Sequence, residues 1–461
     1  MPDSAPALDG RLPRIVHLGP GAFFRAFVVP WVAEAGGWDV IGISLRSAAT
    51  RDALRPQGFD YTTLELGPEG EVARRVTALR DLLVAPEDPE AALDLLADDA
   101  TRIVGLTVTE KGYCHDPATG RLNPDHPDIR HDARAAAPRS APGILVRALA
   151  RRRDAGRAPF TVLSCDNLPG NGALLRGVVI EFARGIDAGL ADWIAAEVAF
   201  PSTMVDRIVP GMSGGDPALA GHAADRPGAA PVLHEPYRQW VIEDDFPQGR
   251  PGFEAVGVRM VEDVAPFEAM KLRMLNGTHS ALAYLGCLAG HRTVSDAVSD
   301  PAFAALCRHL WAREIAPSLT PPDGVDLAAY AEALMARYRN PAIRHFTSQI
   351  AMDGSQKLPP RILRPLSDGL DAGRGVDGLL LVVAGWMRYV AGVDEAGRAH
   401  EVHDPLADRL RAAAGGGVAD LLSVREVFDP ALAARIEAPL HEMHAALVVH
   451  AAREMAGRVA R

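Results

Sequence analysis

Cysteine is scarce in this sequence: the 461 residues include four, and no two of them form a Cys-x-x-Cys pair. Scaffolds held together by disulfides carry many more cysteines in much shorter chains. We therefore expect reduced thiols in a reducing, cytoplasmic compartment. The four residues are Cys114, Cys165, Cys287 and Cys307.

Long hydrophobic runs are also missing. The longest notable run, residues 378–387, lies between Asp377 and Arg388, and it is shorter than the roughly 20 residues that span a bilayer. Residues 1–10 carry proline and aspartate instead of the apolar segment of a secretory signal. We expect neither secretion nor a membrane partner.

Positive charge is in deficit, with a formal net charge of −11. Such a surface repels phosphate backbones, which argues against a nucleic-acid partner. The sequence contains no Walker loop and no G-x-S-x-G elbow, so the characteristic motifs of an NTPase and of an esterase are absent. His441 and His444 lie three residues apart, but no carboxylate or thiolate pattern completes a metal site, and we expect none.

The first half of the chain alternates short β-branched runs with helical patterns. This alternation is typical of a parallel sheet with helices on both faces, and the chain length favours two domains. Strands are expected at 15–19, 40–45, 61–66, 103–107, 160–165 and 198–204, and helices at 22–35, 89–97, 143–153 and 173–184.

The second half is rich in Ala and Leu with helical periodicity, so we expect it to be mostly α. The predicted domains are residues 1–262, an α/β domain with a mostly parallel sheet, and residues 263–461, a helical one. A stretch rich in Gly, Ala and Pro, residues 212–232, is interpreted as a surface loop. Helices are expected at 267–288, 301–315, 327–338, 376–390 and 439–456.

A glycine pair follows the first predicted strand. Gly19 would permit a tight turn, and Gly21 would let a pyrophosphate approach the N–H groups of the next helix. The third glycine of G-x-G-x-x-G is absent, so the motif alone is weak and a plain glycine-rich turn stays an alternative. Its place in the first strand–helix turn favours dinucleotide binding.

The second predicted strand ends without the carboxylate that usually holds the ribose hydroxyls of NAD. Ser44 can bond a hydroxyl, whereas Arg46 either accommodates a 2′-phosphate or is simply solvated. NAD and NADP therefore both stay open at this point. Polar residues also end three further predicted strands, at 107–113, 164–171 and 201–207, where open α/β sheets bind ligands.

Residues 267–279 bring Lys271, Asn276 and His279 together in the sequence. A buried lysine of lowered pKa can act as the base of a dehydrogenase, and Asn and His can donate to a developing alkoxide. On a straight helix, however, Lys271 and His279 stand about 12 Å apart along the axis. Catalysis then requires a long reach or a break at Asn276-Gly277, and spacing alone favours a surface lysine and a structural histidine.

These segments resemble the long-chain mannitol dehydrogenase family, which includes mannitol 2-dehydrogenase, arabinitol dehydrogenase and fructuronate reductase. The resemblance runs from Ile15 to about Glu395, most of the chain. The matching motifs are 15–26 (IVHLGPGAFFRA), 106–114 (LTVTEKGYC), 164–167 (SCDN), 200–207 (FPSTMVDR), 239–244 (QWVIED), 271–279 (KLRMLNGTH) and 353–359 (DGSQKLP).

The resemblance implies a Rossmann-type N-terminal domain, a helical C-terminal domain, a nicotinamide cofactor (NAD, with NADP not excluded) and no metal. Lys271 would be the general acid/base, with Asn276 and His279 polarising the reacting oxygen and with Asn167 and Asp206 near the substrate. The implied cofactor contacts are Gly19, Gly21, Phe23, Arg25, Ser44, Arg46, Glu110 and Asn167. Phe24 and Phe27 depart from the family, which usually has histidine at both positions.

Residues 239–246, 350–359 and 383–389 look closest to fructuronate reductase, which implies reduction of D-fructuronate to D-mannonate. A uronate needs a cation for its carboxylate, and Arg344, Lys357 and Arg361 are the candidates. A polyol dehydrogenase acting on mannitol or arabinitol is the alternative, and a catalytically idle nucleotide-binding paralogue is a third. The sequence does not indicate the oligomeric state.

Overall fold

The structure is a computed structural model that describes residues 11–117, 119–210 and 231–461. The chain divides into two compact units, Met1–Ala265 and Pro266–Arg461. Within the described ranges, no helix is both long enough and apolar enough to cross a membrane.

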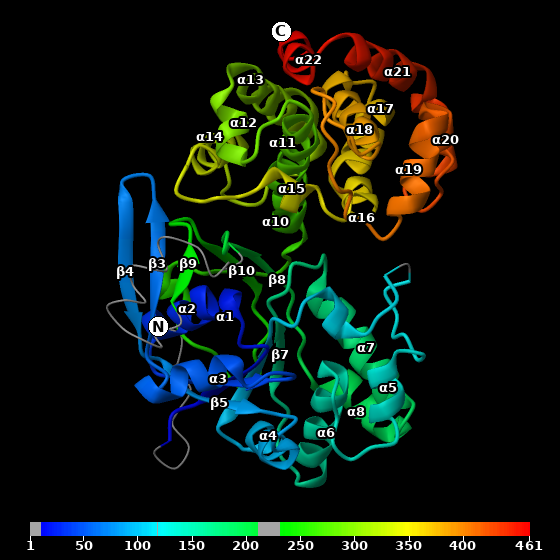
Figure 1. The fold of residues 1–461 in the computed structure, drawn as a ribbon. Coiled ribbons are helices and arrows are strands. Elements are labelled where there is room, and N and C mark those ends of the chain that lie inside the picture. Colours follow the sequence, from blue (N-terminus) through cyan, green and yellow to red (C-terminus); the bar gives the residue numbers. More distant parts are fainter. Residues whose placement is uncertain (1–10, 118, 211–230) are drawn as a thin grey trace. The chain divides into compact units, whose positions relative to one another are not determined.

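A five-stranded parallel sheet forms the centre of the N-terminal unit (Figure 1). Every neighbouring pair of its strands is parallel, which confirms the predicted α/β class. The strand order is β5 (Leu79–Val84), β2 (Asp39–Ser44), β1 (Arg14–Leu18), β6 (Thr101–Leu106) and β7 (Thr161–Ser164). The order reverses beside β1, and a crevice for ligands is expected at such a point.

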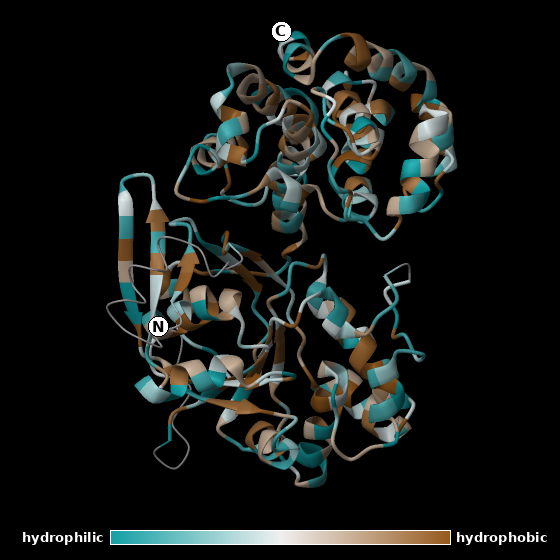
Figure 2. Ribbon diagram, in the orientation of Figure 1, coloured by the Kyte–Doolittle hydropathy of each residue, from teal (hydrophilic) through white to brown (hydrophobic). Residues whose placement is uncertain are grey.

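Alternating residues of these strands pack into two separate hydrophobic cores, because side chains along a strand point to opposite faces of the sheet. Val16 and Val104 pack into one core, and Ile15 and Ile103 into the other. Figure 2 shows hydrophobic residues concentrated along β7 and the adjoining strands. The helices that supply the first core are α4 (Pro89–Ala97), α5 (Pro127–Asp132), α6 (Ala141–Asp154), α7 (Asn171–Arg184) and α8 (Ala188–Glu197). Those that supply the second are α1 (Ala22–Ala26), α2 (Val28–Ala35) and α3 (Ala49–Leu54).

The described residues of this unit also form two small sheets. Three of the strand predictions are wrong or incomplete. The strand predicted at 61–66 lies outside the parallel sheet and pairs antiparallel with an exposed strand that lacks alternation. Leu79–Val84, which was not predicted, takes the edge of the parallel sheet instead. The strand predicted at 198–204 begins only at Thr203. The sheets are β4 (Gly70–Val76), β3 (Tyr61–Gly67) and β9 (Val232–His234), and β11 (Arg259–Val261), β10 (Gln239–Glu243) and β8 (Thr203–Asp206).

The loop predicted at 212–232 lies almost wholly outside the described residues, and its last residue, Val232, begins β9. The single helix predicted at 22–35 is broken at Phe27, whose φ is −125° and ψ −68°. At the break, the ring of Phe27 lies 5.4 Å from that of Trp240, centroid to centroid. The helix is therefore interrupted where Phe27 packs on Trp240. The hydrophobic periodicity of residues 22–35 gives no sign of this interruption.

The C-terminal unit is helical, as predicted. Its central helices are α11 (Gly277–Leu288) and α18 (Asp377–Tyr389), which pack on each other. The last predicted helix, 439–456, is wrong at both ends: α21 (Pro430–Val449) starts earlier, and α22 (Ala452–Val459) is separate. Asp429 explains the start, because its carboxylate accepts the N–H groups of Ala431 and Leu432.

The other helices of this unit are α10 (Ala265–Met270), α12 (Val294–Ser299), α13 (Pro301–His309), α14 (Leu327–Tyr338), α15 (Thr347–Ala351), α16 (Gly354–Leu358), α17 (Arg364–Asp371), α19 (Ala407–Gly416) and α20 (Val418–Leu422). Three π-helical segments interrupt them, at Lys271–Asn276, Leu310–Ile315 and Pro359–Leu363. Such segments are frequent at functional sites. The first of them contains two of the predicted catalytic residues.

Candidate active site

A cavity of about 500 Å³ lies at the carboxyl ends of β1, β2 and β6 in the N-terminal unit. This edge of a parallel sheet is where dinucleotides bind. Its lining includes Gly19, Pro20, Gly21, Ser44, Leu45, Arg46, Ser47, Thr107, Val108 and Thr109. The glycine pair and the end of the second strand, both predicted to bind the cofactor, therefore meet at one cavity.

The geometry of the glycine turn fits a pyrophosphate. Gly19 has a φ of +86°, and a Cβ there would lie 2.3 Å from the carbonyl oxygen of Thr107, so no other residue fits. A Cβ on Gly21 would meet only the carbonyl oxygen of Gly19, 4.0 Å away. The backbone at Gly21 is therefore open to close approach by a ligand.

A buried histidine supports this turn from below. The Thr107 hydroxyl donates to the carbonyl of Gly19 at 2.7 Å and lies 2.9 Å from Nε2 of His17. Burial lowers the pKa of His17 to about 3, so its ring is neutral at physiological pH. Phe24, one of the two departures from the family pattern, stacks on this ring at 4.2 Å. Its place is therefore structural.

The end of β2 is already internally bonded. Ser44 Oγ donates to the carbonyl of Ser47 at 2.6 Å and accepts from its N–H at 3.2 Å. Arg46 is exposed, and one guanidinium nitrogen lies 3.8 Å from a carboxylate oxygen of Asp128. Asp128 also lines the cavity, so it offsets part of the positive charge there.

The other predicted cofactor residues differ in exposure. Phe23 stacks on Phe27 at 4.9 Å. Arg25 is 5% exposed, and burial lowers its pKa. Glu110 and Asn167 are exposed, Glu110 at the start of the short helix Glu110–Tyr113 and Asn167 three residues after the end of β7. Asp206, predicted to lie near the substrate, is buried at the end of β8.

Asp166 and Asn171, to which the sequence analysis assigned no role, form hydrogen bonds that connect the three polar segments at the predicted strand ends. The carboxylate of Asp166 accepts the N–H groups of Val108 at 3.0 Å and Thr109 at 2.9 Å. The amide of Asn171 donates to the carbonyls of Asp166 at 3.0 Å and Thr203 at 2.9 Å. Both lie within the segment 164–171, but only Asn167 was assigned a role there.

In the C-terminal unit, the segment Lys271–Asn276 is a π-helix between α10 and α11. A π-helix places residues five apart, as Lys271 and Asn276 are, near one face. His279 follows Asn276 by three residues in α11 and shares that face. A π-helical turn therefore takes the place of the long reach or helix break that a straight α-helix would require.

Side chains from two other elements satisfy carbonyls of the π-helix. Trp311 Nε1 donates to the carbonyl of Met274 at 3.0 Å, and the Tyr338 hydroxyl donates to that of Leu275 at 2.8 Å. The Thr278 hydroxyl bonds Met274 as well, at 2.6 Å. These bonds compensate for the local change in the helical ladder.

His279 is 6% exposed, and its Nε2 has no hydrogen-bond partner among the described residues. Burial lowers the pKa of His279 well below its usual value, with further contributions from His345, Arg337, Arg361 and Lys271. The His279 ring is therefore neutral, and the cationic side chains of Arg337, Arg361 and Lys271 lie near it. A buried, unsatisfied imidazole nitrogen is costly unless a ligand bonds it. Lys271 is also buried, at 9% exposure.

The three cations predicted to bind a substrate carboxylate have different surroundings in the structure. Arg361 lies 3.4 Å from the Ser280 hydroxyl, next to His279. Lys357 donates to the carbonyl of Met352 at 2.6 Å. Arg344 is exposed, with its guanidinium 5.4 Å from the centroid of the Phe346 ring. Arg337, which influences both His279 and His345, was not predicted.

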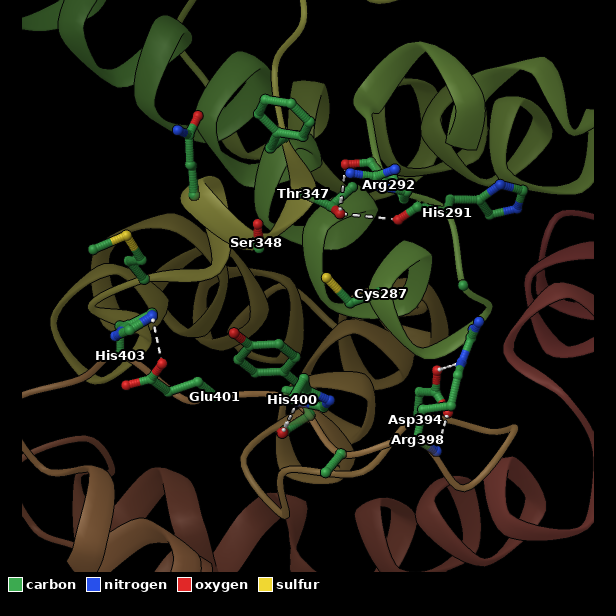
Figure 3. A pocket seen from close by; sticks show the side chains of 16 residues that line it. Cys287, His291, Arg292, Thr347, Ser348, Asp394, Arg398, His400, Glu401 and His403 are labelled. Atoms are coloured by element: carbon green, nitrogen blue, oxygen red, sulfur yellow. Dashed lines mark hydrogen bonds and ion pairs between the residues drawn. The ribbon is translucent and has the colours of Figure 1, made fainter. Parts of the chain in front are cut away.

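A second cavity, of about 620 Å³, lies wholly within the C-terminal unit (Figure 3). Its charged side chains are largely paired: Arg398 with Asp394 at 2.7 Å, and His403 with Glu401 at 3.5 Å. The Thr347 hydroxyl bonds the carbonyl of His291. None of the predicted site residues lines it. Across the described ranges, no cluster of three or more His, Cys, Asp or Glu could hold a metal.

Comparison with known proteins identifies the family. Residues 13–255 match the mannitol dehydrogenase Rossmann domain, and residues 263–443 match the mannitol dehydrogenase C-terminal domain. The chain belongs to the mannitol dehydrogenase family. This confirms the family resemblance and the order of an α/β Rossmann domain followed by a helical domain.

Similar members of the mannitol dehydrogenase family carry names that denote different activities. D-mannonate oxidoreductase of Escherichia coli is 45% identical over 85% of this chain and 83% of its own. The uncharacterized oxidoreductase YeiQ of E. coli is 48% identical over 90% of this chain and 88% of its own. The structure of Pseudomonas fluorescens mannitol 2-dehydrogenase with NAD and D-mannitol is 36% identical, with a TM-score of 0.85 over 99% of this chain and 96% of that chain.

Proposed function

We propose that this member of the mannitol dehydrogenase family interconverts D-fructuronate and D-mannonate with NAD(H). The observation that carries the proposal is the buried, unpartnered Nε2 of His279, with Lys271, Arg337 and Arg361 near it. A neutral imidazole next to a lysine suits a reacting oxygen, and the additional arginine charge suits a carboxylate. The similarity to D-mannonate oxidoreductase supports the same substrate class.

In the reductive direction, the Lys271 ammonium would give its proton to the carbonyl oxygen as that oxygen gains negative charge. Asn276 and the Nε2–H tautomer of His279 would donate hydrogen bonds to the same oxygen. Burial of Lys271 and His279 strengthens these interactions by excluding water. A bound nicotinamide supplies the hydride. In the oxidative direction, neutral Lys271 would take the proton from the hydroxyl.

The cavity at Gly19 and Gly21 fits the pyrophosphate of the cofactor, as described above. NAD is favoured because Arg46 is paired with Asp128, and because a structural relative holds NAD. NADP is the alternative, since residues Ser44 to Ser47 include no carboxylate that would repel a 2′-phosphate. Oxidation of NADH and of NADPH is therefore compared in the assay below.

A polyol dehydrogenase is the second candidate function, because the relative with NAD and D-mannitol is similar along nearly the whole chain. It would use the same oxygen-binding residues and would need no carboxylate site. An idle nucleotide-binding paralogue is disfavoured by the buried Lys271 and His279, which a protein without chemistry does not need.

The test measures reduction of fructuronate and of fructose, with NADH and with NADPH in separate assays, by wild type, Arg361→Gln and Arg344→Gln. We expect turnover of fructuronate and little turnover of fructose. Arg361→Gln should raise KM for fructuronate roughly 10- to 100-fold, since a charge-assisted hydrogen bond is lost. The exposed Arg344→Gln is the matched control and should change KM little. Turnover of fructose in preference to fructuronate, unaffected by Arg361→Gln, would establish the polyol alternative instead.

A further inference from the structure

The wall of the nucleotide cavity is held in an unfavourable backbone conformation. Thr109, which lines the cavity, has φ +64° and ψ 165°. Residues other than glycine rarely adopt this region, and such strain persists only where the surroundings impose it. A Cβ on Gly112, in the same wall, would lie 2.8 Å from the Val108 side chain, so the wall also packs tightly on itself.

One carboxylate behind the wall imposes that conformation. Oδ2 of Asp166 accepts the N–H of Val108, and Oδ1 accepts the N–H of the strained Thr109. The Tyr113 hydroxyl donates to Oδ2 at 3.0 Å. Asp166 is 9% exposed and does not line the cavity itself. Three donors converge on it, which is what a buried carboxylate needs.

Asp166 is itself fixed from the opposite side. Its carbonyl accepts from the Asn171 amide, and Asn171 is tied to β8 through both the carbonyl and the N–H of Thr203. Asp166 and Asn171 therefore connect the wall that follows β6 to the end of β7 and to Thr203, the first residue of β8. Asp166 can hold the strained loop because it is hydrogen-bonded on both sides, through its carboxylate and through its backbone carbonyl.

We propose that Asp166 is a positioning residue for the nucleotide cofactor, because it holds the cavity wall Val108–Gly112 in its binding geometry. This inference rests on the nucleotide-binding half of the proposed function and is independent of the sugar. Loss of the carboxylate frees Thr109 to leave its strained conformation. Binding would then have to restore the wall, and the affinity for nucleotide falls accordingly.

The test is Asp166→Asn, which keeps the shape of the side chain. An amide offers one oxygen to the two backbone N–H groups, so its nitrogen faces a donor. NADH binding is followed by quenching of tryptophan fluorescence without any sugar, so a wrong sugar assignment does not affect the result. We expect Kd for NADH to rise about tenfold or more, and kcat at saturating NADH to change less than about threefold.

Glu314→Gln is the matched control. Glu314 is a buried carboxylate that accepts the backbone N–H groups of Gly378 and Leu379, but it lies in the C-terminal unit. It should lower thermal stability as Asp166→Asn does and leave Kd for NADH within about twofold. A folded Asp166→Asn protein with unchanged Kd would overturn the proposal, as would an equal rise of Kd in both variants.

If Asp166→Asn does not fold, Tyr113→Phe serves the same purpose with a smaller perturbation. It removes one donor to Asp166 and leaves both backbone bonds in place. Kd for NADH should then rise about two- to threefold at constant kcat. No change in Kd for this variant would overturn the proposal.

Discussion

At the scale of single residues, burial decides the charge state of several histidines. His17 has its pKa lowered to about 3, and His234 and His345 to about 4, with desolvation as the main cause in each. These rings stay neutral in the folded protein down to acidic pH. In the unfolded chain they would titrate near 6.5.

This difference predicts acid destabilisation. Below pH 6.5 the unfolded chain binds more protons than the folded protein, so the free energy of unfolding falls as pH drops from 6.5 towards 4. Each of the three histidines contributes about 1.4 kcal/mol per pH unit in that window. We expect urea unfolding to show a loss of roughly 4 kcal/mol from these three histidines between pH 7 and pH 5.5, and a further loss from His279, whose pKa burial also lowers. His234→Asn should lose about 1 kcal/mol less over the same interval. Equal stability at the two pH values would contradict the assignment of neutral buried rings.

At the scale of elements, the π-helix Lys271–Asn276 is the feature that aligns the candidate catalytic residues. Its geometry depends on donors from outside the helix, above all the hydroxyl of Tyr338, which also lies 2.7 Å from that of Thr278. The same tyrosine ring lies 4.7 Å from His279, centroid to centroid. One side chain therefore supports both the backbone turn and the imidazole.

Tyr338→Phe should show whether the Tyr338 hydroxyl supports catalysis beyond its contribution to stability. Loss of the hydroxyl leaves the Leu275 carbonyl without this donor and should lower stability by about 1–2 kcal/mol. Misplacement of Lys271 and Asn276 should reduce kcat about tenfold or more, because small displacements are costly in catalysis. Kd for NADH should not change. Tyr389→Phe, a buried tyrosine of the same unit, is the control, and a kcat equal to that of wild type in Tyr338→Phe would argue against the role of the π-helix.

At the scale of the whole molecule, the sequence predicts the architecture well and the site less completely. Four of the five parallel strands and α14 were identified because their sequence patterns are strong and their ends carry clear signals, whereas the edge strand Leu79–Val84 was missed. The hairpin β3–β4 was misjudged because β4 is exposed and lacks alternation, so no local pattern marks it. Asp166 escaped notice because its role depends on loops distant in the sequence. The π-helix could not be inferred, since its extra residue per turn is stabilised by Trp311 and Tyr338 from elsewhere in the chain.

In the proposed function, Lys271 moves the proton in a nicotinamide-dependent reaction on a sugar-acid carbonyl. The most direct test of this role is Lys271→Ala, with kcat for fructuronate and Kd for NADH measured on the same preparation. In Lys271→Ala, kcat should fall about a hundred- to ten-thousandfold, the usual contribution of general acid–base catalysis, while Kd for NADH stays within about twofold. Retention of most of the turnover by the folded variant would contradict it.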